Sequence, residues 1–240
     1  MEKIVKIQRL KLGDQVYKFL KQRIANHRFV LGCHLNIEEL TRDLGVSRTP
    51  VWEAIRRLER EGLVRNEPKR GVMVVELTPK AAIELYTVRE VLECLAIRFS
   101  VDRMDEKTLK RMAQSLKKQK KVIGQRDLVA YSQLDFEFHG FIYEKCDNAL
   151  LQEMLETIKE RARPINMLIT PILSDLYHDH VLILEALECR NKEKAEEAIS
   201  RHNRLLLEKI KKDVSSGNWL TLKSLQRVTT SPHKKGILRK

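Results

Sequence analysis

The sequence predicts a mainly α protein with an N-terminal winged helix-turn-helix and a C-terminal all-α helical bundle. Three observations support this prediction. Residues 35–77 place a short helix, a glycine turn, a basic helix and a basic hairpin in succession. Residues 78–213 repeat apolar side chains at helical spacing almost throughout. Few stretches alternate with period two, so little sheet is expected outside the hairpin.

The N-terminal helices are expected where apolar residues recur on one face between a capping residue and a glycine, at 12–27, 36–44 and 47–61. Asn36 and Ser47 are good N-caps for the second and third helices. Gly45 allows the left-handed turn between those two helices. Two short strands are expected in the hairpin, at 63–66 and 72–75.

The C-terminal helices begin at Thr78-Pro79, an N-cap followed by proline at the first helical position. Six helices are expected, at Pro79–Arg103, Asp105–Ile123, Asp127–Lys145, Ala149–Asn166, Leu173–Arg190 and Lys192–Asp213. We therefore divide the chain into a winged domain at 1–77, a helical domain at 78–213 and a basic, flexible tail at 214–240.

The charge of the 240-residue chain is concentrated at its two ends. Net charge is +13, of which residues 1–77 contribute +6, residues 78–213 contribute +1 and residues 214–240 contribute +6. A basic end that also carries a helix-turn-helix pattern indicates phosphate partners. For the basic tail, a solvated segment is the plain interpretation and a non-specific DNA-binding extension the weaker one.

The four cysteines are scattered along the chain and form no CxxC pair, at Cys33, Cys94, Cys146 and Cys189. This arrangement favours the reducing cytoplasm over a disulfide framework or a zinc ribbon. The first twelve residues lack the apolar core of a signal peptide, and no run reaches the length of a membrane span. We expect a cytoplasmic protein with no membrane partner.

Residues at two places in the winged domain are candidates for DNA contact. At the start of the basic helix, hydroxyls, backbone N–H groups and the helix dipole favour phosphate, and Arg48 also has the length to reach a guanine edge. In the hairpin, Lys69 and Arg70 suit backbone or minor-groove contact, and Gly71 permits the turn. The candidates are Ser47, Arg48, Thr49, Trp52, Arg56, Lys69, Arg70 and Gly71. A solvated helix face is the alternative interpretation for Arg56, Arg57 and Arg60.

The turn and the start of the basic helix contain the run Leu-Gly-Val-Ser-Arg-Thr-Pro-Val, and Glu-Ala-Ile, Leu and Gly-Leu-Val follow at fixed spacing, with Arg-Gly in the hairpin. This combination resembles the GntR family of bacterial transcriptional regulators. The resemblance covers roughly residues 10–77 and implies binding to an operator in double-stranded DNA. The family usually has a DNA-contacting Arg where this chain has Trp52. The indole either stacks against DNA or packs within the domain, and the operator sequence stays open.

Four polar residues stand on otherwise apolar faces of the C-terminal helices. Asp135 and His139 form an i, i+4 pair on the inward side of one helix, and His180 and His202 lie on apolar stripes of two others. One Asp and three His can bind a divalent transition metal. The alternative interpretation is a set of hydrogen-bonded core residues.

The spacing of the last two histidines sets a condition on this site. His180 and His202 are 22 positions apart, which is about 33 Å along one continuous helix. They can share a metal only if the chain reverses between them, and Arg190-Asn191 is a suitable turn.

The helical domain contains the motif Asp-x-x-Phe-His, then His-x-x-Ile-Leu-x-Ala-Leu, and then a His 22 residues after the His of the second motif. This pattern is similar to the FCD ligand-binding domain of the FadR subfamily. The resemblance implies that Asp135, His139, His180 and His202 bind a metal, with zinc most favoured and nickel as the other choice. His178 is a weaker alternative to His180 because it does not fit the motif.

Arg89 faces the bundle on an apolar stripe, and a buried Arg needs an anionic partner. The plain interpretation is an internal salt bridge or a side chain that extends its charged end to solvent. The functional interpretation is capture of the carboxylate of an effector, for which family members often use an Arg at this place. Arg163 and Asn166 are weaker candidates for the same effector site.

Together these features predict a homodimeric transcriptional regulator, acting as a repressor on a palindromic operator and controlled by a small organic acid bound at the metal. One alternative is a regulator whose effector is the metal itself. A metallohydrolase is the other, and against it Glu137, the acidic residue nearest the Asp135–His139 pair, points off their face.

Overall fold

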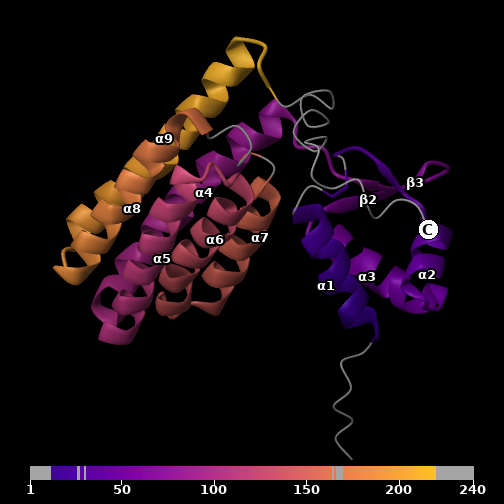
Figure 1. The fold of residues 1–240 in the computed structure, drawn as a ribbon, viewed down its shortest axis with the longest axis horizontal. Helices are drawn as coiled ribbons and strands as arrows, with labels where there is room; N and C mark the ends of the chain where they lie inside the picture. Colours follow the sequence, from indigo (N-terminus) through magenta and orange to yellow (C-terminus); the bar gives the residue numbers. More distant parts are fainter. Residues whose placement is uncertain (1–11, 26–27, 30, 164, 166–169, 220–240) are drawn as a thin grey trace, which may run out of the picture. The chain divides into compact units, whose positions relative to one another are not determined.

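The computed structural model describes residues 12–25, 28–29, 31–163, 165 and 170–219. These residues form two compact units, and the division falls between Glu76 and Leu77. The fold class is the one that the sequence predicts, mostly helical with a small N-terminal sheet (Figure 1). The helical unit begins one residue earlier than expected, because Leu77 is buried in one of its core clusters.

Three helices make up most of the N-terminal unit, namely α1 (Leu12–Ala25), α2 (Ile37–Leu44) and α3 (Arg48–Arg60). Both α1 and α2 pack against α3. Asn36 caps α2, since its side-chain oxygen accepts from the backbone N–H groups of Glu38 and Glu39 at 3.0 and 3.2 Å. Ser47 occupies the N-cap position of α3, but its hydroxyl makes no capping hydrogen bond.

The sheet of this unit has three antiparallel strands in the order β1-β3-β2, namely β1 (His34–Leu35), β2 (Val64–Glu67) and β3 (Gly71–Val74). The hairpin between β2 and β3 is the expected wing, paired from Val64 with Val74 to Glu67 with Gly71. Gly71 has φ 78°, a conformation that favours glycine. β1 was not predicted from the sequence, because two residues are too few to show a period.

The C-terminal unit is a bundle of α4 (Pro79–Ser100), α5 (Glu106–Gly124), α6 (Leu128–Lys145), α7 (Ala149–Ala162), α8 (Leu173–Glu188) and α9 (Lys192–Ser215), with short 3-10 turns at Val101–Arg103 and Thr170–Ile172. Side chains that accept from the backbone N–H three residues later cap five of these helices, at Thr78, Asp105, Asp127, Asn148 and Asn191. These local signals explain why most starts agree with the sequence expectation. The last turn of the fourth expected helix differs, because α7 ends at Ala162 and not at Asn166.

Within the bundle, α4 packs against α9, α7 and α6, while α5 packs against α6 and α8 (Figure 1). The helices α8 and α9 form an antiparallel pair, since the chain reverses at Arg190 (φ 53°) and Asn191. This is the reversal that a site shared by His180 and His202 requires.

The part of the chain that packs against the bundle extends beyond Asp213, the expected end of the last helix. α9 continues to Ser215, and Trp219 packs against the core cluster that contains Leu77. The Trp219 Nε1–H donates to the carbonyl oxygen of Leu77 at 3.3 Å. Residues 214–219 therefore do not belong to the flexible tail expected from residue 214, and residues 220–240 lie outside the described part of the chain. Among the helices that the structure describes, none is both long and apolar enough to cross a membrane.

Candidate metal centre and nucleic-acid interface

One face of helix α3 is buried in the N-terminal unit, and the opposite face is exposed to solvent. Val51, Ile55 and Leu58 are fully buried on the inner face. The candidate DNA-contacting residues are exposed, apart from the half-buried Trp52; they are Ser47, Arg48, Thr49, Arg56, Lys69, Arg70 and Gly71. The arrangement presents hydroxyls and cations from the start of α3 and from the wing, as phosphate contact requires.

Two of the candidate arginines have carboxylate neighbours on the surface. Arg48 Nη2 lies 2.8 Å from Glu38 Oε1, and Arg70 Nη1 lies 3.5 Å from Glu67 Oε2. Exposed pairs of this kind contribute little to stability, so both guanidinium groups can exchange a carboxylate for a phosphate.

Arg57, which sequence analysis interpreted as part of a solvated face, has a structural role. Its guanidinium pairs with Asp14 and lies 3.8 Å from the centre of the Tyr17 ring, both on α1. Arg57 thus fixes α3 to α1, and Arg56 and Arg60 remain on the exposed side.

Three helices of the C-terminal unit bring the predicted metal ligands together. Asp135 and His139 come from α6, His180 from α8 and His202 from α9, and one ligand atom from each lies within 4.8 Å of the others. The three imidazoles are fully buried, and the Asp135 side chain is 14% exposed. The exposed His178 lies outside this cluster, as does the exposed Glu137.

The hydrogen-bond network assigns the proton on two of the imidazoles. Gln119 Nε2 donates to the carbonyl oxygen of Leu134 at 3.4 Å, so its Oε1 faces His180 Nδ1 at 2.8 Å and accepts the proton there. Arg89 Nη2 lies 3.5 Å from His139 Nε2, and because Arg only donates, this nitrogen is the acceptor. Both rings are therefore protonated at Nδ1.

As a consequence, lone pairs face one another inside the bundle. The Nε2 atoms of His139 and His180 are 3.3 Å apart, and each lies about as far from Asp135 Oδ1, at 3.6 and 3.5 Å. Three acceptor atoms in contact repel one another unless a cation lies between them. Carboxylate oxygen and imidazole nitrogen are ligands that zinc and nickel accept.

His202 completes this set with two unsatisfied nitrogens. Its side chain is fully buried, and neither Nδ1 nor Nε2 has a hydrogen-bond partner within the described residues. An unsatisfied buried polar atom costs about 1–3 kcal/mol. A metal ion bound at either nitrogen removes part of this cost, so the residues fit a transition metal.

Burial keeps the three imidazoles neutral. It lowers the pKa of His180 to about 3, with the neighbouring His139 adding to the effect, and it places the pKa of His202 well below its usual value. The pKa of His139 is also lowered by burial, although Glu93 opposes the shift. Burial would raise the pKa of Asp135, but His139 and Lys159 together hold it below its usual value. Neutral imidazoles and an ionised carboxylate are the forms that bind metals.

Arg89 lies beside this cluster and already has an anionic partner. Its side chain is 4% exposed, and its Nε donates to Glu93 Oε1 at 3.1 Å. The internal ion pair that sequence analysis left open is therefore present. Glu93 was not predicted, although its position four residues after Arg89 on the same buried face was a readable signal.

Of the two other candidate effector residues, the structure describes Arg163. Arg163 pairs with Glu160 at 2.5 Å and lies 4.2 Å from the centre of the Phe136 ring. Asn166 lies outside the described part of the chain.

Lys159 is a buried cation that sequence analysis also missed. It is 4% exposed, and its Nζ donates to the carbonyl oxygens of Asp135 and Phe136 at 2.8 and 2.7 Å. Burial lowers the pKa of Lys159 to about 7, against the opposing charge of Asp135. The spacing of Leu151, Leu155 and Lys159 on the buried face of α7 could have indicated this inward position.

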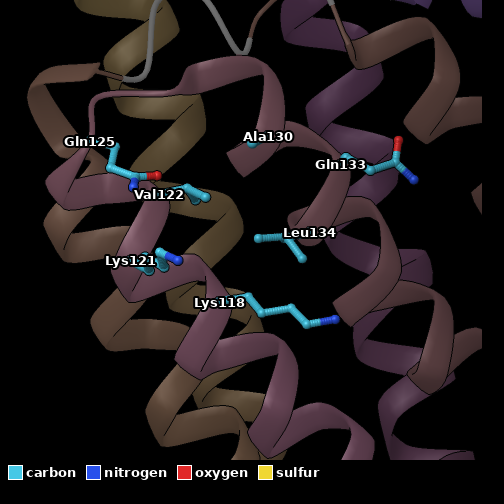
Figure 2. A pocket seen from close by; sticks show the side chains of 7 residues that line it. All are labelled: Lys118, Lys121, Val122, Gln125, Ala130, Gln133 and Leu134. Carbon is cyan, nitrogen blue, oxygen red and sulfur yellow. The ribbon is translucent and has the colours of Figure 1, made fainter.

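A surface groove of about 390 Å³ opens between α5 and α6 (Figure 2). Its lining consists of Lys118, Lys121, Val122, Gln125, Ala130, Gln133 and Leu134. None of these residues belongs to the four-ligand cluster. One lining residue, Leu134, is connected to the cluster, because its carbonyl oxygen accepts from Gln119, whose Oε1 faces His180.

Comparisons with known proteins agree with this architecture. Residues 12–74 match the gntR family of bacterial regulatory proteins, and residues 84–205 match the FCD domain. The HTH-type transcriptional regulator YdhC of Bacillus subtilis is 31% identical over 193 residues, covering 78% of this chain and 86% of that protein.

More distant relatives give the same result. The HTH-type transcriptional repressor RspR of Escherichia coli is 25% identical over 203 residues, covering 83% of this chain and 89% of that protein. The structure of E. coli McbR/YncC, at 22% identity, superposes with a TM-score of 0.77 over 86% of this chain and all of that one, which shows a shared fold. The chain therefore belongs to the GntR family of bacterial regulatory proteins, with a C-terminal FCD domain, and is a DNA-binding transcriptional regulator.

Proposed function

We propose that this regulator is a metal-containing repressor whose affinity for DNA is controlled by a small carboxylate bound in the helical unit. Asp135, His139, His180 and His202 hold the metal, with zinc as the first choice and nickel as the second. The observation that carries the proposal is the fully buried His202, whose two nitrogens lack a hydrogen-bond partner among the described residues while one of them lies within 4.8 Å of the other three ligand atoms. Repression is inferred from relatives such as RspR and the gluconate operon transcriptional repressor of B. subtilis.

The bound metal supplies a Lewis acid that accepts a carboxylate oxygen. Arg89 supplies N–H donors next to it, since its Nη2 lies 3.5 Å from a ligand nitrogen. Control of DNA binding requires that the acid bind more tightly to one conformation of the regulator than to another. Arg163 and Asn166 are secondary candidates for contact with the same acid.

We propose further that the protein is a homodimer that binds a palindromic operator in double-stranded DNA. The exposed large apolar side chains of the helical unit support this proposal. They occur mainly on the neighbouring helices α4 and α7, at Val88, Val91, Phe99, Leu150 and Met154. A second copy that covers this face removes apolar surface from water.

One observation favours a second candidate function, in which the metal itself is the effector. The ligand imidazoles are fully buried, so solvent does not reach them directly. In that case DNA affinity responds to zinc or nickel with no organic acid present.

Thermal unfolding of chelator-stripped and zinc-reloaded protein against a panel of small organic acids tests these proposals. A ligand at 100 times its Kd adds about 2.7 kcal/mol, which shifts Tm by roughly 2–4 °C per kcal/mol. An acid-induced shift seen only with zinc supports the carboxylate effector. A shift with zinc and none with any acid favours the metal as effector, and no response to zinc or nickel refutes the metal site.

A further inference from the structure

We infer that Glu93 is a positioning residue that orients His139 and holds Arg89, so that metal binding and anion binding depend on one carboxylate. The inference rests on the proposed function, because it assumes that the four-residue cluster takes a metal. It concerns a residue that neither ligates the metal nor contacts the effector directly.

Glu93 is fully buried on α4 and is surrounded by donors from three helices. Its Oε1 lies 3.1 Å from Arg89 Nε and 3.0 Å from His139 Nδ1, and it also accepts from the Tyr143 hydroxyl. Its Oε2 accepts from Asn203 Nδ2 at 2.6 Å. The carboxylate therefore joins α4 to α6 and, one residue beyond the ligand His202, to α9.

The contact with His139 is on the side of the ring away from the metal site. Glu93 Oε1 and His139 Nδ1 lie 3.0 Å apart, so the carboxylate attracts the Nδ1–H dipole of the ring. A carboxylate at this place fixes the ring orientation and makes the opposite nitrogen a stronger ligand. Burial alone would raise the pKa of Glu93, but Arg89 and His139 hold it well below its usual value, so the group is ionised.

The three ligand histidines differ in this support. His139 has the carboxylate of Glu93, and His180 has the neutral amide of Gln119 at 2.8 Å. His202 has no partner among the described residues. Only the support of His139 carries a charge, so its loss has the largest expected effect on metal affinity.

The same carboxylate holds Arg89 in a position where its contact with His139 competes with a metal. Arg89 Nε is held by Glu93, while Nη2 lies 3.5 Å from His139 Nε2, the nitrogen that faces Asp135 and His180. If His139 Nε2 held a metal, Arg89 Nη2 would have no acceptor there and could donate to an anion beside the metal. The expected order of binding is therefore metal first and anion second.

Removing the charge of Glu93 while keeping its shape tests this coupling. Glu93→Gln keeps an oxygen for His139, and Glu90→Gln is the matched control. Glu90 lies one turn earlier on α4 and binds Arg204 and Ser200 of α9 at 2.6 and 2.8 Å, away from the cluster. In chelator competition, Glu93→Gln is expected to lower zinc affinity about 10–100-fold, and Glu90→Gln to leave it unchanged.

A second readout separates positioning from a general loss of structure. Acetate binding is measured with and without zinc. In the wild type zinc should increase acetate affinity; in Glu93→Gln the unpaired Arg89 should bind acetate without zinc, so the zinc dependence falls. Acetate affinities that fall in parallel with zinc affinity, with and without the metal, contradict the inference.

If Glu93→Gln does not fold, the double variant Arg89→Gln, Glu93→Gln can be measured in its place. It is expected to fold because it removes both buried charges together. It should also bind zinc weakly and lose the response of acetate to zinc. Wild-type zinc affinity in either folded variant overturns the role of Glu93 and leaves the metal site intact. Absence of zinc binding in the wild type overturns the metal site itself.

Discussion

Replacing His202 by Leu should change stability in opposite directions with and without metal. His202 is fully buried, and both of its nitrogens lack a hydrogen-bond partner in the described part of the chain. In the metal-free protein, Leu removes two unsatisfied atoms that cost about 1–3 kcal/mol each. Against this stands a change of shape in the core of about 1–1.5 kcal/mol. The metal-free variant is therefore expected to unfold a few degrees above the wild type, at about 2–4 °C per kcal/mol.

Zinc should reverse this order. At 100 times its Kd the ion stabilises the wild type by about 2.7 kcal/mol, a rise in Tm of about 5–11 °C. The variant keeps three ligands, Asp135, His139 and His180, and should gain only a small part of that rise at the same zinc concentration. Differential scanning calorimetry on chelator-stripped and zinc-loaded samples of both proteins measures the two differences.

Either of two results would refute this reasoning. A metal-free His202→Leu protein that is several kcal/mol less stable than the wild type would mean that His202 is a hydrogen-bonded core residue. A variant that retains the full response to zinc would mean that His202 is not a ligand. His178→Leu is the control, since His178 is exposed on α8 outside the cluster and should leave the response to zinc unchanged.

Three further predictions concern other parts of the molecule. Lys69→Gln on the wing should weaken DNA binding about equally for all sequences and reduce the slope of log K against log salt by about 1, as fluorescence anisotropy with duplex DNA can measure. Val91→Glu, on the exposed apolar face of α4, should shift a homodimer towards monomer in sedimentation velocity, whereas the similarly exposed Val129→Glu on α6 should not. The pKa of Asp105 is held below its usual value, chiefly by Lys145. The charged carboxylate therefore contributes stability above the unfolded pKa of about 4, and this contribution is lost as pH falls through the folded pKa. Asp105→Asn should destabilise the protein at pH 7 and make little difference near pH 1.

Each of these three has a result that would contradict it. An unchanged salt slope would place Lys69 away from phosphate. Dimers that survive Val91→Glu would move the interface to another face. A difference between Asp105→Asn and wild type that stays constant from pH 7 to pH 1 in urea titrations would show that the charge of Asp105 does not stabilise the fold.

Most of the fold could be predicted because its boundaries are local. An N-cap such as Thr78 before Pro79, or Asn191 at the turn between α8 and α9, acts on backbone groups three residues away, and the sequence displays it directly. The features that sequence analysis missed depend on packing. β1 exists because His34 and Leu35 pair with Met73 and Val72, which are nearly forty positions away.

The candidate site shows the same limit. The inward positions of Asp135, His139, His180 and His202 follow from helical periodicity, and one turn explains how His180 and His202 approach each other. The approach of α6, which carries Asp135 and His139, depends on the packing of the bundle. The residues that support the four ligands do not follow from periodicity, since Glu93 acquires its role from His139 and Tyr143, both about fifty positions later. Periodicity indicates which face a residue occupies, whereas the partner across the bundle depends on how the helices cross.

The chain enters the helical unit at Leu77, so the packing around this residue is one place where the proposed effector site can influence the connection to the DNA-binding unit. The helix that carries His202 extends towards that point, because Ile210, Val214 and Trp219 belong to the same core cluster as Leu77. The hydrogen bond from Trp219 to the Leu77 carbonyl attaches the end of this segment to the first residue of the unit. Tyr86, whose hydroxyl lies 3.4 Å from Arg89 Nη1, belongs to that cluster as well. A close-packed core does not deform continuously, but it can switch between two discrete packing arrangements of its side chains. Such a switch can amplify a small displacement at one site. Under the proposed function, we expect an effector that changes the position of Arg89 or α9 to alter the packing around Leu77, where the connection to the DNA-binding unit begins.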